Sequence, residues 1–362
     1  MAKIYIESLF FYFMLTKKQV SEIKEHLERA QRPIFFFDND PDGLCSFILL
    51  QKYIGRGKGV SIKSFPELIE EDFRKVQELN ADYIFILDKP LVSNSFFDQA
   101  EKFNIPVVWI DHHFIDKSEI PKFVNYYNPV FNKKKTEEPV TALCYQITKR
   151  KEDLWLAVVG CISDHFVPDF YEDFEKAYPE FKVKEKKPFG ILYNSPIGKI
   201  VMILSFGLKD RTTNVVKMIK FLTGAKGPYD VLEENKKNQS FHERYNDLNS
   251  KYQNILKKSI SAEESDKKVL FFKYGGDFSV SRDLSNELSY KFENKVIVVA
   301  YVRGLKANIS MRGENVKDLL SKAIKGLENA RGGGHRNAVG GQIQVKDVEE
   351  FKERLEKLTT LE

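Results

Sequence analysis

The sequence predicts a two-domain α/β protein: a parallel sheet covered by helices, then a helical segment, then a smaller α/β unit. Short runs that are apolar throughout alternate with helix-like stretches over residues 15–162, which is typical of parallel strands buried on both faces. A long polar helical run follows, and a second alternation begins near residue 266. We therefore predict domains at residues 1–185, 186–265 and 266–362, the middle one being a helical connector.

The first domain is expected to contain four strands and five helices. The strands are rich in aromatic and branched residues and cover residues 33–37, 60–65, 81–88 and 106–111. The helices have apolar residues at helical spacing and cover residues 16–31, 43–54, 68–79, 95–103 and 153–166.

The rest of the chain is expected to begin with helices and to end as a second α/β unit. Residues 186–262 have a helical pattern that ends in a charged run without caps, 229–260. The second unit is expected to contain strands at 268–274, 295–304 and 306–313, helices at 281–292, 315–327 and 348–358, and a glycine-rich loop at 330–345.

Composition indicates a soluble globular protein, because 42% of the 362 residues are hydrophobic and 30% are charged. The net charge of +5 is compatible with a nucleic-acid partner but does not argue for one. Three scattered cysteines form no disulfide or zinc pattern, so we expect a cytoplasmic protein. The apolar segment 4–15 contains Glu7 and is shorter than the roughly 20 residues of a membrane span; we expect it to pack, in one interpretation against a partner.

Acidic residues follow the first predicted strand at alternate positions, as Asp38, Asp40 and Asp42, before Gly43. An EF-hand calcium loop begins in the same way but requires a preceding helix and a glutamate at its twelfth position, which here is Leu49. The calcium loop is therefore excluded.

Further acidic residues end later elements: Asp88, Asp111 before His112 and His113, and Asp164. Open α/β sheets bind ligands at the carboxyl ends of their strands. Carboxylates that converge there repel one another unless cations lie among them, and oxygen ligands with one or two imidazoles suit Mn²⁺ or Mg²⁺. Two such ions can activate water and neutralise charge on a phosphoryl group. The alternative is that these aspartates are ordinary helix caps and turn formers.

These motifs resemble, in order, those of the DHH phosphoesterases that carry a C-terminal DHHA1-type domain. The similar segments are DNDPDG, the aspartate of FILDKP, DHH, GCISD, KANISMRG and RGGGH. The resemblance implies two bound divalent ions, usually Mn²⁺, held by Asp40, Asp42, Asp88, His112 and Asp164, with Asp88 bridging. It also implies that His113 faces the scissile phosphate, and that Asp38 and Asp111 are further ligands or orient the others.

One position departs from the family pattern. Several branches carry a histidine ligand four residues before the aspartate that matches Asp40, and here that position is Phe36. Either the first metal is held more weakly or Asp38 substitutes. The aspartate-rich motif points towards RecJ-like nucleases.

The glycine-rich C-terminal segment is expected to bind phosphate, because glycines let backbone N–H groups approach an anion and arginine can bind it with two hydrogen bonds. A glycine run can equally be a simple turn. With the resemblance, the expected substrate-binding residues are Ser310, Arg312, Gly332, Gly333, Gly334, His335 and Arg336. One domain would then carry the metals while the other anchors a phosphate.

The resemblance implies a metal-dependent exonuclease on single-stranded DNA or RNA that releases mononucleotides, similar to archaeal RecJ-like and Hef-associated nucleases of repair or replication. A second interpretation is a phosphodiesterase for very short RNAs, 3′-phosphoadenosine phosphate or cyclic dinucleotides. A third is an inactive scaffold similar to Cdc45 relatives. A helicase or another replication or repair protein is an expected partner.

Overall fold

The computed structural model describes residues 14–63 and 67–360, so the apolar segment 4–15 lies almost entirely outside the described residues. The chain divides into two compact units, Met1–Tyr245 (unit 1) and Asn246–Glu362 (unit 2). The division falls inside helix α12 (Gln239–Ser261), so the connection between the units is helical, as predicted. The finer domain limits, 185 and 265, stay predictions.

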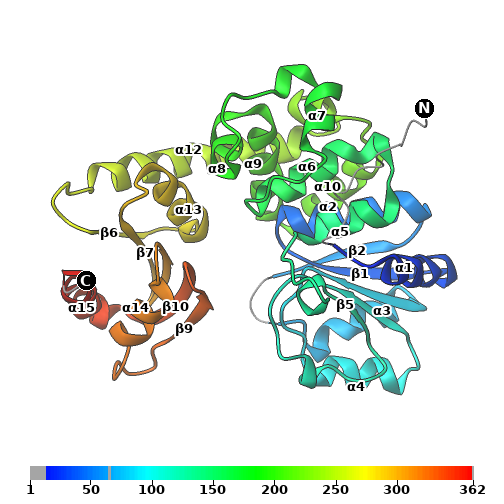
Figure 1. Cartoon of the computed structure of the whole chain (residues 1–362), viewed down its shortest axis with the longest axis horizontal. Coiled ribbons are helices and arrows are strands. Elements are labelled where there is room, and N and C mark those ends of the chain that lie inside the picture. Colours follow the sequence, from blue (N-terminus) through cyan, green and yellow to red (C-terminus); the bar gives the residue numbers. More distant parts are fainter. Residues whose placement is uncertain (1–13, 64–66, 361–362) are drawn as a thin grey trace, which may run out of the picture. The chain divides into compact units, whose positions relative to one another are not determined.

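Unit 1 is built on a five-stranded parallel sheet with the order β2-β1-β3-β4-β5, which confirms the predicted fold class (Figure 1). The strands are β1 (Pro33–Asp38), β2 (Lys58–Ile62), β3 (Tyr83–Leu87), β4 (Val107–Ile110) and β5 (Asn125–Tyr127). The sequence analysis missed β5, a strand of only three residues.

Both faces of this sheet are buried, because alternate residues of each strand point to opposite sides. On β1, Phe35 and Phe37 belong to one core and Ile34 and Phe36 to another. The first core includes α1 (Lys17–Arg29), α2 (Pro41–Ile54), α5 (Val140–Thr148) and α6 (Leu154–Ser163). The second includes the 3₁₀ turn η1 (Glu70–Phe73), α3 (Arg74–Glu78) and α4 (Asn94–Lys102).

A helical region completes unit 1, with α6 packed on α9 and α2 on α10. Its helices are α7 (Tyr171–Ala177), α8 (Pro188–Asn194), α9 (Pro196–Leu208), α10 (Thr212–Gly224) and α11 (Pro228–Leu232). Short 3₁₀ turns are η2 (Lys117–Glu119), η3 (Pro129–Phe131), η4 (Lys151–Asp153) and η5 (Pro179–Phe181). In the described part of the chain no single helix could cross a membrane by its length and hydropathy; only α8 and α9 together meet that test, and they are bent by 78°.

The predicted helical run 229–260 is interrupted, which corrects the sequence analysis. Buried Asn238 separates α11 from α12: its side-chain amide donates to the carbonyl oxygens of Asp230 and Glu233, at 3.0 and 2.8 Å. Its Oδ1 accepts the N–H of Asn235 at 2.7 Å. The run therefore carries a capping residue that the periodicity did not indicate.

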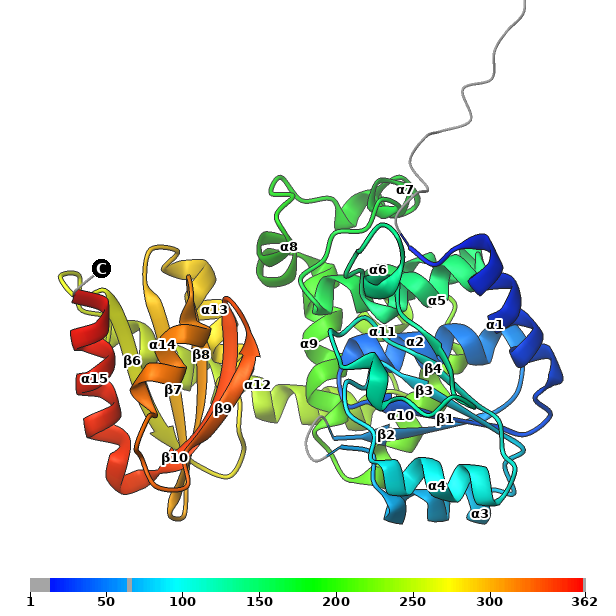
Figure 2. The ribbon, with the colours of Figure 1, turned by 60° about the horizontal axis from the view of Figure 1, so that its bottom comes forward.

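Unit 2 contains a five-stranded mixed sheet with the order β6-β7-β8-β10-β9, in which only β6 and β7 are parallel. The strands are β6 (Val269–Gly275), β7 (Val296–Arg303), β8 (Lys306–Arg312), β9 (Arg331–His335) and β10 (Ala338–Gln344). Figure 2 shows α14 (Val316–Ala323) and α15 (Val348–Thr360) over this sheet, and their apolar residues share its core. The helix α13 (Ser281–Lys291) contacts β7 and β8, and the 3₁₀ turn η6 is Val345–Asp347.

The glycine-rich segment 330–345, predicted as a loop, instead forms strands β9 and β10, which pair antiparallel with each other. Its glycines are needed for close packing. A Cβ at Gly332 would lie 2.6 Å from the Leu320 side chain, and Gly334 has a φ of +137°, which side chains disfavour. Hydrogen bonds to β10 order a sequence that by itself has little preference for a strand.

Candidate metal centre

The acidic motifs meet at the carboxyl ends of the parallel strands, as the sequence predicts. Asp38 ends β1, Asp88 directly follows β3, and Asp111 follows β4. Asp40 caps α2 by accepting the N–H of Gly43 at 3.1 Å, and Asp164 ends α6. Adjacent parallel strands end at one edge of the sheet, so residues far apart in sequence lie close together there.

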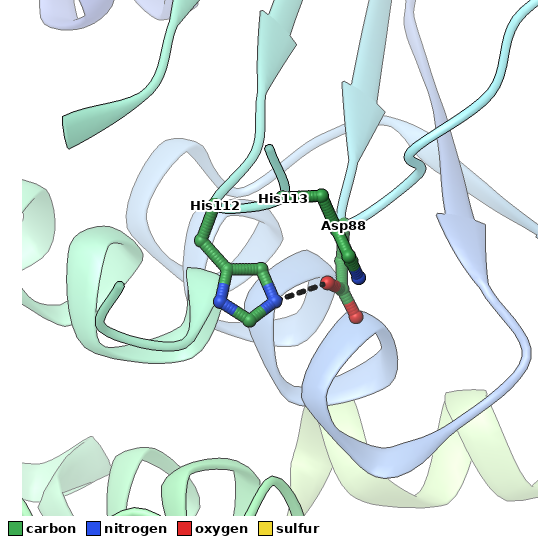
Figure 3. Close-up of side chains that lie close together, drawn as sticks. All are labelled: Asp88, His112 and His113. Carbon is green, nitrogen blue, oxygen red and sulfur yellow. Dashed lines mark ion pairs between the residues drawn. The ribbon is translucent and has the colours of Figure 1, made fainter. Parts of the chain in front are cut away.

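Three groups of side chains each place one potential ligand atom per residue within 4.8 Å of the others. They are Asp38, Asp40 and Asp88; Asp42, His112 and Asp164; and Asp88, His112 and His113. Figure 3 shows the last group. All five predicted metal ligands occur in these groups, with Asp88 in two of them. Their role as ligands remains a prediction.

Phe36, which replaces a histidine of the family pattern, lies away from this cluster. Its side chain is fully buried in the core on the α3 and α4 side of the sheet, 5.5 Å from the Phe96 ring. Asp38, in contrast, belongs to a group with Asp40 and Asp88. This arrangement is compatible with Asp38 substituting for the missing histidine.

Asp42 is held by the beginning of α5. Its Oδ2 and Oδ1 accept the backbone N–H groups of Val140 and Thr141, at 3.0 and 2.8 Å. Burial, and then the charge of Asp164, raise the pKa of Asp42 to about 7. Keeping this carboxylate charged is therefore costly without a nearby cation.

Asp88 occupies a strained position at the centre of the cluster. Its φ of +58° lies in the left-handed region, which few residues other than glycine adopt, and its N–H donates to the Ile110 carbonyl oxygen at 3.0 Å. Burial, followed by the charges of Asp42 and Asp40, raise the pKa of Asp88 well above its usual range. Backbone strain of this kind is frequent at functional sites.

His112 is oriented with one ring nitrogen towards the carboxylates. Its Nδ1 lies 3.3 Å from the Glu137 carbonyl oxygen, while Nε2 lies 3.3 Å from Asp88 and 3.8 Å from Asp164. A backbone partner at one nitrogen is the usual support of a metal-binding histidine. Burial alone would lower the pKa of His112, but the neighbouring carboxylates, Asp164 foremost, raise it.

His113 is held by a chain of hydrogen bonds that the sequence analysis did not identify. Its Nδ1 lies 2.8 Å from Oδ1 of Asp111, a fully buried residue. The Tyr126 hydroxyl donates to Asp111 at 3.3 Å. The Asn128 amide donates to the Tyr126 hydroxyl at 2.7 Å and to the His113 carbonyl oxygen at 2.8 Å. Tyr126 and Asn128 lie in and just after the unpredicted strand β5.

Lys89 is a second residue that the sequence analysis missed. Its side chain is fully buried, and Nζ lies 3.2 Å from Oδ1 of Asp38 and 2.8 Å from the Lys63 carbonyl oxygen. A buried lysine needs such partners. Its sequence position, directly after Asp88 at the end of an apolar strand, was the available signal.

Close packing shapes the backbone around these residues. A Cβ at Gly43 would lie 2.5 Å from the Asp38 carbonyl oxygen, so only glycine lets the start of α2 approach the end of β1 this closely. The carboxylates at the start of α2 and the end of β1 therefore lie nearer one another than any side chain at position 43 would permit.

In unit 2, Arg312 is fixed by several partners. Its Nε donates to Oδ1 of Asn286 at 2.5 Å, and Nη1 donates to the Met311 carbonyl oxygen at 2.7 Å and lies 3.3 Å from the Ser310 hydroxyl. The Ser285 hydroxyl contacts that of Ser310 at 2.8 Å. Asn286 and Ser285 were not among the predicted binding residues.

The remaining predicted binding residues of unit 2 lie on strand β9 and at Arg336, which directly follows it. Across the sheet, Arg312 is in register with Ala338, and Ala338 with His335, so the glycine strand runs two strands from Arg312. The Arg336 side chain instead donates to Asn315, at 2.6 Å. A phosphate-binding role for any of these residues remains a prediction.

The donor set of unit 1 fits divalent cations. It consists of carboxylates and one or two imidazoles, which suit Mg²⁺ and Mn²⁺, and the three buried cysteines are not part of it. Burial and neighbouring carboxylates raise the pKa of both Asp42 and Asp88. A cation among these crowded carboxylates would stabilise their charged form.

Comparisons with known proteins give the family. The model of the DHH family, N-terminal domain, matches residues 34–162, and that of the DHHA1 domain matches residues 266–360; together they cover more than half of the chain. No curated protein sequence matches the chain.

Solved structures of low identity share the fold. Manganese-bound exonuclease RecJ is 14% identical, with a TM-score of 0.64 over 96% of this chain and 95% of that one. CDC45 from Entamoeba histolytica is 10% identical, with a TM-score of 0.54 over 95% of this chain and 99% of that one. The pGpG-specific phosphodiesterase PggH from Vibrio cholerae is 11% identical, with a TM-score of 0.52 over 91% of this chain and 99% of that one. The two domain matches, in this order, show that the chain belongs to the DHH family of phosphoesterases, with a DHHA1 domain at its C-terminal end.

Proposed function

We propose that this protein is a metal-dependent phosphodiesterase that removes mononucleotides from one end of single-stranded DNA or RNA. The observation that carries the proposal is the intact cluster at the carboxyl ends of β1, β3 and β4, where three overlapping groups of carboxylates and imidazoles lie within ligand distance. An inactive scaffold has no need to keep this many mutually repelling buried charges together.

Asp40, Asp42, Asp88, His112 and Asp164 would hold two divalent cations, with Mn²⁺ the first choice and Mg²⁺ the second. Such cations, when bound, make water a stronger nucleophile and stabilise negative charge on phosphoryl oxygens. Asp88 and His112 each belong to two of the ligand groups, but only the carboxylate has two oxygens to offer, so Asp88 would be the shared ligand.

His113 is the residue we assign to the scissile phosphate. Asp111 engages its Nδ1 at 2.8 Å, and the Tyr126 hydroxyl in turn supports Asp111. The ring is thereby held in one orientation, with Nε2 as the nitrogen that donates to a phosphoryl oxygen. A ring held in this orientation can stabilise negative charge that develops on the phosphate.

An exposed aromatic residue beside this histidine supports a nucleic-acid substrate. Phe114 directly follows His113 and is 75% exposed. Its ring stacks against that of Phe131, with centroids 6.1 Å apart, and the Lys117 ammonium lies 5.7 Å from the Phe131 ring centroid. Exposed aromatics with nearby lysines are the usual platform for stacking single-stranded bases.

Unit 2 would bind a substrate phosphate through Arg312. Because Asn286 and Ser310 fix the guanidinium, little side-chain entropy is lost on binding. Strand β9 is the last strand of its sheet, and a Cβ at Gly333 would meet nothing within 4 Å, so this part of its backbone is open to an approaching anion.

The main alternative is a phosphodiesterase for very short RNAs, 3′-phosphoadenosine phosphate or cyclic dinucleotides. It has the same chemistry, and PggH shares the fold. Phe114 favours longer single strands, because a base stacked outside the cluster belongs to a neighbouring nucleotide. We place the activity in DNA repair or replication in the cytoplasm, with a helicase or related protein as partner.

The test is a Mn²⁺-dependent digestion of single-stranded DNA and RNA of graded length, labelled at either end. Asp88→Ala is the inactive variant, and Asp98→Ala, at an exposed position of α4, is its matched control. We expect stepwise shortening from one end with the wild type and Asp98→Ala, and none with Asp88→Ala. Cleavage of only the shortest oligomers would favour the alternative. No Mn²⁺-dependent cleavage of any length would refute the enzyme and leave the scaffold.

A further inference from the structure

Unit 1 contains a second charged site, which we call the basic hollow. It is an open depression of about 1010 Å³, and no residue of the acidic cluster lines it. Its basic residues come from α10, from the segment after α10 and from the connection between α11 and α12: Lys217, Lys220, Lys226, Lys236 and Lys237.

The charges of the basic hollow are not balanced by the protein. All five lysines are exposed, and none makes an ion pair with another described residue. Asp230 is the single acidic residue of the lining, and its Oδ2 already accepts the backbone N–H of Lys226 at 2.7 Å. Five ammonium groups around one depression repel one another, so an anion with several charges is the ligand that relieves them.

An aromatic ring accompanies these charges. Phe221 lines the basic hollow and is partly buried, with its centroid 5.3 Å from that of Phe241. Its position is therefore fixed by packing. A positively charged surface with an aromatic ring is the combination that binds single-stranded nucleic acid without sequence preference.

Helix α2 connects the basic hollow to the metal centre. Asp40 and Asp42 lie at its beginning, whereas near its end Gln51 accepts a hydrogen bond from Thr223 at 2.7 Å and Lys52 donates to the Ala225 carbonyl oxygen at 2.9 Å. Ala225 lines the hollow, and α10 lies beside α2 (Figures 1 and 2). From Asp42 to Gln51 the helix rises about 14 Å, at 1.5 Å per residue.

We propose that the basic hollow binds the phosphate backbone of the same single-stranded nucleic acid whose end is cut at the metal centre. This inference rests on the proposed function for the identity of the ligand. Residues 41–50 of α2 are buried, so a strand must pass around the helix and about 14 Å is the shortest separation between the two places. It corresponds to at least about four nucleotides at about 3.4 Å each, so only longer strands can occupy both places. The basic hollow would therefore raise affinity for polymers and leave the hydrolysis of a trinucleotide unchanged.

The test compares Lys217→Ala/Lys220→Ala with Lys17→Ala/Lys151→Ala, which removes the same charge from two other exposed positions of unit 1. Binding of a fluorescein-labelled 20-mer of deoxythymidine is followed by anisotropy in EDTA, from 0.05 to 0.5 M salt. Each lost phosphate contact reduces the salt slope by about 0.7. We expect a slope about 1.4 smaller, or roughly 25-fold weaker binding at 0.1 M salt if both proteins bind alike at 1 M.

Trinucleotide hydrolysis in Mn²⁺ separates this inference from the function itself. We expect the hollow variant to hydrolyse the trinucleotide at the wild-type rate. An unchanged salt slope would overturn the proposal, as would an equal loss of 20-mer binding in the control variant. Unchanged 20-mer binding with weakened binding of polyglutamate would assign the basic hollow to an acidic protein instead. If the wild type cleaves no substrate but the hollow variant still binds the 20-mer more weakly, the result would support nucleic-acid binding by the basic hollow and refute the proposed nuclease activity.

Discussion

Replacement of Lys89 by methionine tests the electrostatic account of the metal centre. The Lys89 side chain is fully buried and that of Asp38 is 7% exposed, with Nζ and Oδ1 3.2 Å apart. Removing one partner of a buried ion pair leaves the other charge uncompensated, which costs about 3–5 kcal/mol. The Lys63 carbonyl oxygen also loses its partner at 2.8 Å. We therefore expect the free energy of unfolding without metal to fall by about 3–5 kcal/mol.

The assay is urea unfolding in EDTA, followed by tryptophan fluorescence. Both tryptophans, Trp109 and Trp155, are buried in unit 1, so the signal reports that unit alone. Lys122→Met, at an exposed position, is the control. In the double variant Lys89→Met/Asp38→Asn both charges are gone, and we expect it to regain most of the lost stability.

Mn²⁺ provides the second readout of the same variant. Without Lys89, Oδ1 of Asp38 is no longer held by an ammonium group and its charge can attract a cation, so we expect Mn²⁺ to stabilise Lys89→Met more than the wild type. A loss below about 0.5 kcal/mol in EDTA, within the range of ordinary surface substitutions, would refute the reasoning. So would a double variant that is no more stable than the single one.

Three further predictions concern neighbouring residues. Without metal, the free energy of unfolding should fall as the pH rises from about 4 to about 7, because the pKa of Asp42 is about 7 in the folded protein and 3.8 in the unfolded chain. Asp42→Asn should flatten this slope in urea unfolding at graded pH, and a free energy that rises over the same range would contradict the prediction. Asp111→Asn should lower kcat at least about tenfold with little change in KM, by releasing His113; an unchanged kcat in steady-state kinetics would refute the positioning role. Phe114→Ala should raise KM for single strands about tenfold, from a stacking contribution of roughly 1–3 kcal/mol per base, without altering urea stability; an unchanged KM would exclude the platform.

Strands β1 to β4 of unit 1 and the cluster at their ends were predictable because both depend on local patterns. A run such as Pro33–Phe37, apolar at every position, indicates a strand buried on both faces. Asp38 and Asp88 then follow such runs, and the parallel order of strands brings their ends to one edge. Neither inference requires contacts between distant side chains.

The supporting residues could not be predicted in the same way, because their roles depend on tertiary contacts. Lys89 is an ordinary charged residue in sequence, and only burial against Asp38 gives it a function. Tyr126 supports Asp111 from a strand of three residues, too short for a periodic pattern. Strand β9 was predicted as a loop because its glycines have low strand propensity, which its pairing with β10 overrides.

The most direct test of the central claim is calorimetric titration of the full chain with Mn²⁺ at pH 7.5, beside Asp88→Ala and Asp98→Ala. The account predicts two bound ions for the wild type and for Asp98→Ala, and the loss of both in Asp88→Ala, because Asp88 contributes to two of the ligand groups. Absence of binding by the wild type, or equal binding by Asp88→Ala, would contradict a metal centre in this cluster.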